Sequence, residues 1–340
     1  MRRAAAILLM ALLTLTACTS NGAAPRDPGK VVLPVKQVSI PGRLYATKGR
    51  TLYRFSGTHL TRLLVGTRLK DPAVTRDGAR LAFAQLQDQS STIVLADAGG
   101  QNLQSITAAS GPDGALWAFA PHYSDDGQQI VYLTDRGKQR SSPQNLQPND
   151  LSVWRYEVSR GLSRQIVAPI PYTGGESDPG LRPGVSEQLL YTTYLYGGSP
   201  PQAVARLTWM STRTGAIVYL SPDGARNFQP AFSPDGRFVA FVHAGSGSDD
   251  LYVMPLGATF TREPRPYPTD GAVLLESGMV SQPVWAPDGS AIAFLKLVNG
   301  SFDLFIQQVA ISGAVQATGQ AQAVTHGSFL DADSRLAWSP

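Results

Sequence analysis

One phrase recurs along the chain, and this repeat constrains the fold more than any other feature of the sequence. Each copy has a proline-led apolar run, a turn of the Pro-Asp-Gly type and a second apolar run. The copies span residues 71–83, 120–132, 229–241 and 282–294. Their turns are separated by about 50 residues or about twice that, and a fixed period of this size indicates an array of similar units. The double gap predicts an eroded copy near Arg182, where Asp178-Pro179-Gly180 precedes a short apolar run.

The chemistry of the phrase is that of a β-hairpin. Asp followed by Gly is a strong hairpin signal, because Gly accepts positive φ and Asp hydrogen-bonds its own local backbone. The preceding proline cannot donate to a ladder and suits a strand start. Apolar residues lie four and six positions after each turn aspartate: Leu81 and Phe83, Ile130 and Tyr132, Val239 and Phe241, Ile292 and Phe294. A period of two places each pair on one sheet face, where we expect it to pack on a neighbouring unit.

The two ends of the chain complete one another. Residues 335–340 match the first strand of the phrase and then stop, whereas residues 43–65 hold three strand-like runs with no phrase before them. Three N-terminal strands and one C-terminal strand make a four-stranded blade, so that the ring closes without an open sheet edge. The sequence therefore predicts an all-β fold, a six-bladed β-propeller closed by pairing of residues 43–65 with residues 335–340. Five and seven blades are the alternatives.

The N-terminus has the features of a targeting segment. Arg2 and Arg3 precede an apolar stretch, residues 4–17, which is too short and too terminal for an ordinary spanning helix. The sequence Leu15-Thr16-Ala17-Cys18 resembles the lipobox of bacterial lipoproteins. The resemblance implies cleavage before Cys18 and attachment of a diacylglyceryl group to its sulfur, which would anchor the protein at the cell envelope, outside the cytoplasm. We expect a signal peptide over 1–17, a flexible tether over 18–40, which is rich in small residues and proline, and the propeller over 41–340.

Composition narrows the classes of partner. The formal net charge is +4, no run of Lys or Arg is present, and two of the arginines lie in the signal peptide, which argues against nucleic acid. Cys18 is the single cysteine, so a disulfide framework is not possible within the chain. No metal-ligand spacing and no nucleophile elbow occurs in the sequence, and we assign neither cofactor nor catalytic residue. We expect a monomer.

The phrase x-P-x-[WF]-S-P-D-G, clearest at residues 229–241 and 282–294, resembles the WD-like repeat of TolB-like β-propellers. The same repeat occurs in the propeller domains of prolyl-oligopeptidase-type peptidases. The resemblance covers about residues 42–340 and implies the propeller fold. It implies little about function, because one scaffold hosts many functions. The tether is too short for the N-terminal α/β domain that TolB-like proteins usually carry, and the chain has no room for a peptidase domain.

Candidate ligand-binding residues come from the repeat itself. Propellers tend to bind where their inner strands begin, and one residue of each unit precedes the strand-starting proline or its equivalent. These residues are Asp71, Ala120, Asp178, Gln229, Gln282 and Arg335. We expect this ring at the mouth of the central channel, where its polar members bind a small polar ligand or a peptide. The alternative is that they only hydrate and pin the mouth.

Two further candidates are His122 and Glu176. His122 belongs to the innermost strand of its unit, and it either faces the channel as a ligand contact or proton carrier or is a satisfied buried histidine. Glu176 and Asp178 fall in a Gly-rich loop, 173–178, where two carboxylates suit acid–base chemistry or a cation. The alternative is an ordinary solvated loop.

Three connections between the expected strands are longer than the fold requires: 134–149, 168–178 and 257–282. They combine arginine, proline and tyrosine, which suits protein or peptide contact, and we expect them on one face at the channel mouth. The sequence thus predicts a membrane-anchored, non-enzymatic module that binds protein or peptide partners. A propeller enzyme acting on glycans or lactones and a sensor of a small solute are the alternatives.

Overall fold

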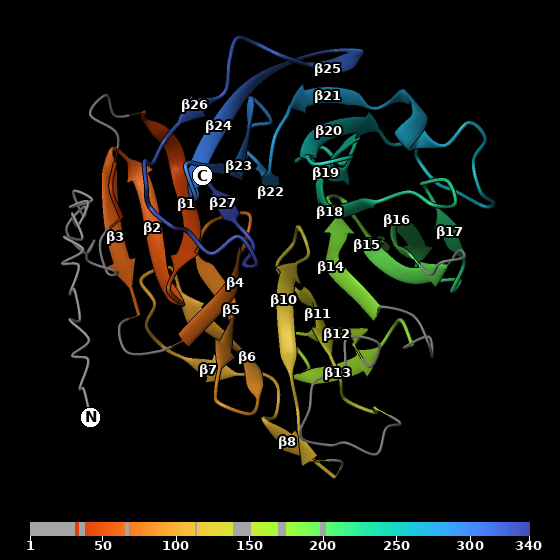
Figure 1. Cartoon of the computed structure of the whole chain (residues 1–340). Helices are drawn as coiled ribbons and strands as arrows, with labels where there is room; N and C mark the ends of the chain where they lie inside the picture. The colour runs from red at the N-terminus through yellow and green to blue at the C-terminus, as the bar shows by residue number, and fades with distance from the viewer. Residues whose placement is uncertain are drawn as a thin grey trace, which may run out of the picture. The chain divides into compact units, whose positions relative to one another are not determined.

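The protein folds into six small antiparallel sheets arranged as the blades of a propeller, as the computed structural model shows (Figure 1). The structure describes residues 31–33, 38–64, 68–112, 114–138, 151–168, 175–197 and 202–340. The predicted signal peptide and Cys18 lie outside these residues. Within the described part, η2 (Pro268–Gly271) is a short 3-10 helix, and no helix there is long and apolar enough to cross a membrane.

Each blade has its innermost strand at the centre of the ring, and its other strands follow outward. From the centre outward, blade 1 contains β27 (Ala337–Ser339), β1 (Ile40–Lys48), β2 (Thr51–Gly57) and β3 (His59–Leu63). Blade 2 contains β4 (Arg68–Val74), β5 (Arg80–Leu86), β6 (Ser91–Asp97) and β7 (Gln104–Ser105). Blade 3 contains β10 (Ala118–Tyr123), β11 (Gln129–Thr134), β12 (Ser152–Glu157) and β13 (Leu162–Gln165).

Blade 4 contains β14 (Gly175–Arg182), β15 (Val185–Gly197), β16 (Gln202–Ser211) and β17 (Ile217–Tyr219). Blade 5 contains β18 (Asn227–Phe232), β19 (Phe238–Ala244), β20 (Asp249–Pro255) and β21 (Val273–Glu276). Blade 6 contains β22 (Val280–Trp285), β23 (Ala291–Val298), β24 (Ser301–Ser312) and β25 (Ala314–Ala317), with β26 (Gln322–Ala323) also paired to β24. A small hairpin of β8 (Ser110–Gly111) and β9 (Gly114–Ala115) follows blade 2.

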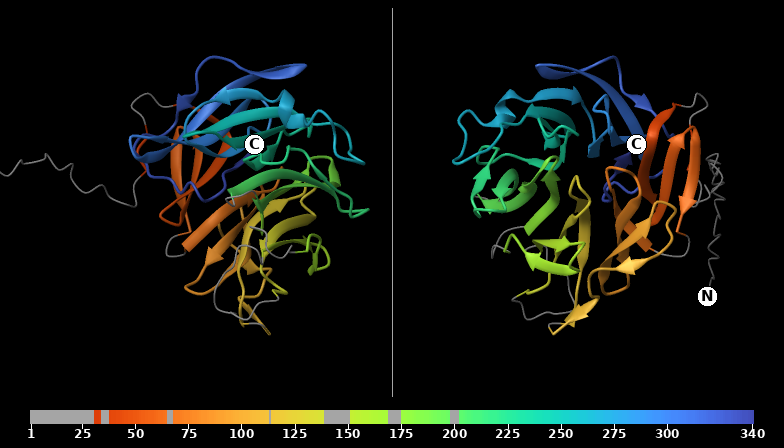
Figure 2. Two further views of the ribbon diagram at one scale, coloured as in Figure 1. Left: turned by 45° about the vertical axis from the view of Figure 1, so that its right-hand side comes forward. Right: turned by 180° about the vertical axis from the view of Figure 1, so that it is seen from behind.

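The ring closes as the sequence predicts. β27, from the C-terminal end of the chain, lies beside β1 (Figure 1) and pairs antiparallel with it. Leu44 lies opposite Trp338 in this ladder, and Figure 2 shows the ring from two further sides. The indole Nε1 of Trp338 donates a hydrogen bond to the carbonyl oxygen of Pro41 at 2.7 Å. The first and last strands therefore share one sheet, and the six-bladed count is confirmed.

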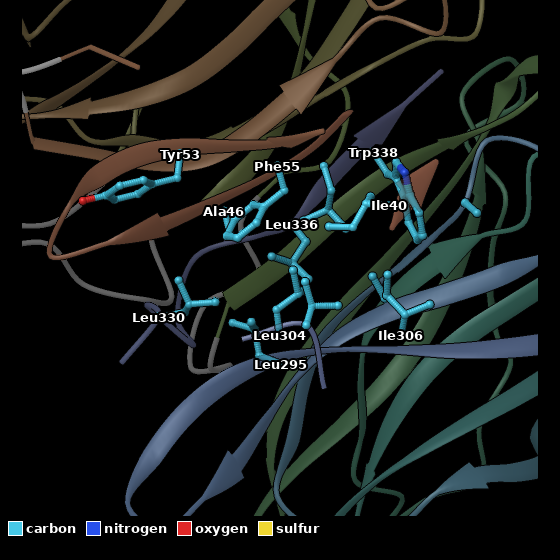
Figure 3. Packing of buried hydrophobic residues seen from close by; sticks show 14 of the residues in the cluster. Ile40, Ala46, Tyr53, Phe55, Leu295, Leu304, Ile306, Leu330, Leu336 and Trp338 are labelled. Carbon is cyan, nitrogen blue, oxygen red and sulfur yellow. The ribbon is translucent and has the colours of Figure 1, made fainter. Parts of the chain in front are cut away.

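The core lies between the blades. Where blade 6 meets blade 1, Phe55 and Trp338 pack with Leu304 and Ile306 (Figure 3). The predicted apolar pairs face the preceding blade: Leu81 and Phe83, for example, pack on blade 1. At about 25 cal/mol per Å² of apolar surface removed from water, such interfaces hold the blades together.

Residues that precede β1 in the chain also pack against the propeller. Val31 is buried in the cluster between blades 1 and 6, and Leu33 and Val38 pack against it. The carbonyl oxygen of Val32 accepts hydrogen bonds from the backbone N–H of His326 and the hydroxyl of Ser328, at 3.0 Å each. The packed body thus includes residues that we assigned to the tether.

The repeated turns are built as the phrase suggests. In the copy at residues 233–237, Oδ1 of Asp235 accepts hydrogen bonds from the hydroxyl of Ser233 at 2.7 Å and the N–H of Arg237 at 3.0 Å. Gly236 has a φ of +67°, a conformation that suits glycine. We call the face of the ring that carries these turns the turn face.

The expectation that three long connections share one face is wrong. β11 ends at Thr134 and β14 begins at Gly175, both at the end of the ring opposite the turns, whereas β20 ends at Pro255 beside the turns. Arg182, at the turn end of β14, donates hydrogen bonds to the carbonyl oxygens of Gly257 and Ala258 at 2.8 and 2.9 Å. Direction alternates between successive antiparallel strands, so a connection after a second strand and one after a third strand lie on opposite faces. Residues 139–150 and 169–174 of these connections lie outside the described residues.

Candidate functional site

A β-bulge interrupts the inner strand of five blades. The bulged residues are Asp71, Ala120, Asp178, Gln229 and Gln282, with φ between +49° and +55°. A proline follows each of them, and the ladder register shifts there by one residue. Positive φ is uncommon for residues other than glycine, and bulges commonly redirect a side chain. The bulges make these five positions a distinct ring within the channel.

The ring lies within the inner strands and not at their start. β4 begins at Arg68, three positions before Asp71, and the other inner strands likewise begin two or three residues before the bulge. The predicted place at the start of the inner strand is therefore wrong for these five positions, because the ladder continues on the far side of each bulge. Arg335, the sixth member of the predicted ring, does precede its inner strand, β27. The ring is a belt inside the channel.

Asp71 joins three blades through this belt. The residue is 3% exposed. Oδ2 accepts a hydrogen bond from the N–H of Ala120 at 3.1 Å, and Oδ1 accepts one from the N–H of Arg335 at 3.1 Å. Its own N–H donates to the hydroxyl of Ser334 at 2.9 Å. Burial raises the pKa of this carboxyl, while the nearby Lys70 opposes the shift. Asp71 is not among the residues that line the central pocket described below, and its contacts are those of a structural link.

Two glutamines link further blades. Oε1 of Gln229 accepts a hydrogen bond from the N–H of Gln282 at 2.8 Å. The amide Nε2 of Gln282 donates to the carbonyl oxygen of Ala332 at 3.2 Å. Blade 5 is thus tied to blade 6, and blade 6 to the segment that enters β27.

Arg335 crosses the channel. Its Nη1 donates a hydrogen bond to the carbonyl oxygen of Pro179 at 3.0 Å, and its Nε lies 3.7 Å from Oδ1 of Asp178. Arg335 precedes β27 in blade 1 and Asp178 belongs to β14 in blade 4, and these blades are opposite one another in a ring of six. The side chains of Arg335 and Asp178 are 12% and 15% exposed. The pair spans the channel and closes one end of the pocket described next; we call this end the floor.

A pocket of about 240 Å³ lies between this floor and the turn face. All six blades contribute to it through their inner strands, mainly with proline, aromatic and aliphatic residues. The walls include Pro72, Pro121, Pro230, Phe232, Pro283, Val284, Trp285 and Leu336. At the rim, Arg76 of blade 2 and Asp125 of blade 3 form an ion pair with an N–O distance of 2.6 Å. The pocket is narrow, largely apolar, and polar at its floor.

His122 lines this pocket, as one of the two sequence-based interpretations proposed. Its Nδ1 accepts a hydrogen bond from the N–H of Leu181 at 3.4 Å, so that the ring proton resides on Nε2. Burial lowers the pKa of His122 to about 3, and the positive charge of Arg335 adds to the shift, while an interaction with the backbone of Tyr123 opposes it. The imidazole is therefore neutral at physiological pH.

Glu176 lies apart from the pocket. The segment predicted as a loop before the third inner strand is part of β14, because the long β15 continues the ladder, and Glu176 pairs with Thr193. The residue is 2% exposed, and neither carboxylate oxygen has a hydrogen-bond partner in the part of the chain that the structure describes. Burial raises the pKa of Glu176 to about 7. Asp178 faces the channel, so the structure does not join the two carboxylates in one site.

Among the predicted candidates, the pocket brings together His122, Asp178, Gln229, Gln282 and Arg335. Asp71 and Ala120 belong to the belt but not to the lining, and Cys18 lies outside the described residues. Sequence reasoning missed Phe232 and Trp285, which we interpreted only as strand residues. Their shared position, directly before the turn in each phrase, was the available signal. The described residues contain no group of three or more His, Cys, Asp or Glu side chains placed to hold a metal ion.

No protein-family model matches the sequence, and no curated protein is similar to it. Solved structures are similar in fold. TolB from Acinetobacter baumannii superimposes with a TM-score of 0.62 at 17% identity, over 90% of this chain and 67% of that chain. The chain has a TolB-like β-propeller fold.

Other solved structures share this TolB-like architecture. A chain of the nidogen–laminin complex gives a TM-score of 0.57 at 10% identity, over 88% of this chain and 98% of that chain. An oligogalacturonate lyase from Vibrio parahaemolyticus gives 0.50 at 15% identity, over 84% of this chain and 75% of that chain. Likenesses at such low identity concern the fold of this TolB-like propeller, since one scaffold hosts many functions.

Proposed function

We propose that this protein is an extracytoplasmic propeller, anchored to the membrane through lipidated Cys18, that binds a protein or peptide segment at its turn face. The observation that carries the proposal is the central pocket. It is closed at one end by Arg335 and Asp178 and is walled by prolines and aromatic residues from all six blades. Concave apolar sites with a few convergent polar groups are the usual form of a binding site.

Prolines and aromatic side chains suit an inserted segment of another chain. They offer rigid apolar contact at low cost in side-chain entropy, as at the centres of protein interfaces. The rim is polar, with the Arg76–Asp125 pair, and the pocket is too small to hold a folded domain. A loop or terminus of a partner is the matching ligand.

The anchoring part of the proposal is tested separately. Mass spectrometry of the mature protein is expected to find an N-terminal Cys18 that carries acyl chains. Cys18→Ser is expected to release the protein from membranes, because acyl chains contribute about 0.8 kcal/mol per buried CH₂ to membrane affinity. An unmodified Cys18 in the membrane-bound protein would contradict it.

The binding part is tested by site-specific crosslinking with fragment 19–340. A photo-crosslinking amino acid at Val74, in the pocket wall, is expected to capture envelope proteins or peptides. The same group at Leu297, which is 37% exposed and lies at the opposite end of the ring, is the matched control. Capture at Val74 should be lost when Gly180→Val narrows the pocket. The proposal would be overturned if the group at Leu297 captured as much as the group at Val74, or if Gly180→Val left capture at Val74 unchanged.

A propeller enzyme acting on glycans or lactones is the second candidate function. It is favoured by one observation: His122 and the Asp178 carboxylate line the same pocket. Asp71→Asn, Asp178→Asn and His122→Gln, each assayed against glycan and lactone panels, test it. The enzyme is favoured if the native protein turns over a substrate, Asp178→Asn or His122→Gln abolishes this activity, and Asp71→Asn retains it. A panel without turnover favours the binding module.

A further inference from the structure

The charged side chains of the central pocket are already paired. Four residues with a formal charge line it: Arg335 with Asp178 at the floor, and Arg76 with Asp125 at the rim. His122 adds no charge, because its pKa of about 3 keeps the imidazole neutral. An ionic ligand group would leave one charge uncompensated in a partly desolvated space, which is costly.

Hydrogen-bond donors, in contrast, remain without acceptors. The Nδ1 of His122 accepts from Leu181, so its Nε2 carries a proton for which the described residues provide no acceptor in hydrogen-bonding geometry. The same holds for Nε2 of Gln229, whose Oε1 accepts from Gln282, and for Nη2 of Arg335, whose Nη1 donates to Pro179.

At the rim, Nη1 of Arg76 donates to Asp125, and most of the uncharged donors of the lining have an acceptor within the protein. Side chains with an internal acceptor are Tyr123, Ser124, Gln282, Trp285 and Trp338. The open donors of His122, Gln229 and Arg335 come from blades 3, 5 and 1, and all three residues line one pocket. A donor that faces the pocket and has no acceptor within the protein is available to a ligand that can accept a hydrogen bond.

Two of these donors converge on one short stretch of β14. Arg335 is bonded to Pro179 and His122 to Leu181, on either side of Gly180. A Cβ placed on Gly180 would lie 3.8 Å from Nε2 of His122 and 3.9 Å from Cδ2 of Phe232, which is ordinary contact distance. The space in front of Gly180 is therefore open on its pocket side, between a donor and an aromatic ring.

We propose that the pocket binds an uncharged group with a carbonyl or amide oxygen, held by the N–H donors of His122, Gln229 and Arg335 between apolar walls. This inference rests on the proposed function and specifies the ligand chemistry of the same site. A Gln or Asn side chain or backbone amide of an inserted peptide has this chemistry, and so has a free small amide.

Three small probes of one shape test the claim: benzamide, benzoate and benzylamine, titrated into fragment 19–340 and followed by NMR. Benzamide is expected to bind at least about fivefold more tightly than either ion, which corresponds to the usual value of one hydrogen bond. Binding should change little between pH 5 and pH 9, because His122 stays neutral throughout. Benzoate binding as tightly as benzamide, or no binding of benzamide, would overturn the proposal.

Isosteric variants assign the donors. Gln229→Glu keeps the oxygen that accepts from Gln282 and removes the amide donor, and His122→Phe keeps a planar ring without the N–H. Each should weaken benzamide binding by about fivefold, and Gly180→Ala should weaken it by placing a methyl group in the pocket. Ser290→Ala, in an exposed turn, is the control. Unchanged affinity in both donor variants, with unchanged melting temperatures, would contradict the assignment.

Two further measurements distinguish a peptide from a free small molecule as the source of the amide group. If it belongs to a peptide, a short N-acetylated, C-amidated peptide with a central Gln competes with benzamide and reduces crosslinking at Val74. If it belongs to a free small molecule, native mass spectrometry of the protein isolated from cells shows the bound mass. Crosslinking that depends on Gly180 without any benzamide binding would leave the proposed function standing and refute this inference. Benzamide binding without crosslinking that depends on Gly180 would refute the proposed function alone.

Discussion

At the scale of single residues, one buried and one partly buried titratable side chain couple stability to pH in opposite directions. Glu176 is a carboxyl whose folded-state pKa is raised to about 7, and His122 is an imidazole whose folded-state pKa is lowered to about 3. In both cases burial disfavours the charged form. Their effects on stability overlap between pH 4.5 and pH 6.5 and partly cancel in the native protein.

Glu176→Gln is expected to remove a loss of stability at alkaline pH. With a raised pKa, the contribution of Glu176 is fully present below pH 4.5 and is lost as pH rises through about 7. The full difference is at most about 3 kcal/mol. Urea unfolding at pH 5 and pH 8 should show that Glu176→Gln stabilises the protein at pH 8 and flattens this part of the pH profile. An unchanged slope would show that the carboxyl is solvated or paired.

His122→Gln is expected to act on the acid side. With a depressed pKa, the contribution of His122 is present above pH 6.5 and is lost as pH falls toward 3. The variant should therefore lose less stability than the native protein between pH 6.5 and pH 4.5, as measured by the same unfolding experiment. A steeper acid loss in the variant would contradict the neutral state assigned to His122.

At the scale of the β-strand, the bulges explain which parts of the site could be predicted. The phrase and its apolar pairs were predictable because turn chemistry and alternation are local properties of the sequence. The conformation of Asp71 and Asp178 was not, since a residue before proline ordinarily adopts an extended conformation. Nor could a local pattern indicate that Arg335 reaches Asp178 across the channel, because that contact depends on closure of the whole ring. We assigned Glu176 to a loop because the glycines beside it are typical of loops, and the sequence does not show that the ladder between β14 and β15 continues through them.

The bulge makes one substitution behave unusually. Ala120 has a φ of +49°, and its methyl side chain accepts no hydrogen bond. Ala120→Gly should therefore leave stability unchanged or raise it by up to about 1 kcal/mol, because glycine adopts this conformation without strain. The control is Ala82→Gly in β5, which should cost about 1 kcal/mol. Thermal unfolding compares the two, and an equal loss in both would contradict the strained bulge.

The belt that joins the inner strands is tested through Asp71. Asp71→Ala leaves the buried N–H groups of Ala120 and Arg335 without their acceptor, so we expect a loss of about 2–4 kcal/mol. Asp88→Ala removes only an exposed ion pair with Arg68 and should change stability by less than about 1 kcal/mol. Urea unfolding at pH 7 provides the comparison. A small effect of Asp71→Ala would show that the blades hold together without this link.

At the scale of the whole molecule, closure of the ring and formation of the site are one event. The segment that enters β27 carries Arg335, which spans the channel to blade 4 and floors the pocket, while Trp338 of the same strand packs between blades 1 and 6. A chain that failed to close would lose the floor together with the sheet. The pocket therefore exists only when the first and last strands are paired.

The most direct test of the closed ring is a disulfide between the two strands that close it, β1 and β27. Arg43 lies opposite Ser339 in the β1–β27 ladder, and Cα atoms of such antiparallel pairs lie within the range that a disulfide needs. In fragment 19–340, we expect near-complete oxidation of Arg43→Cys with Ser339→Cys and retained benzamide binding. Arg43→Cys with Ala337→Cys, which is two positions out of register, should oxidise poorly. Equal oxidation of both pairs, or none in the first, would contradict the closed ring.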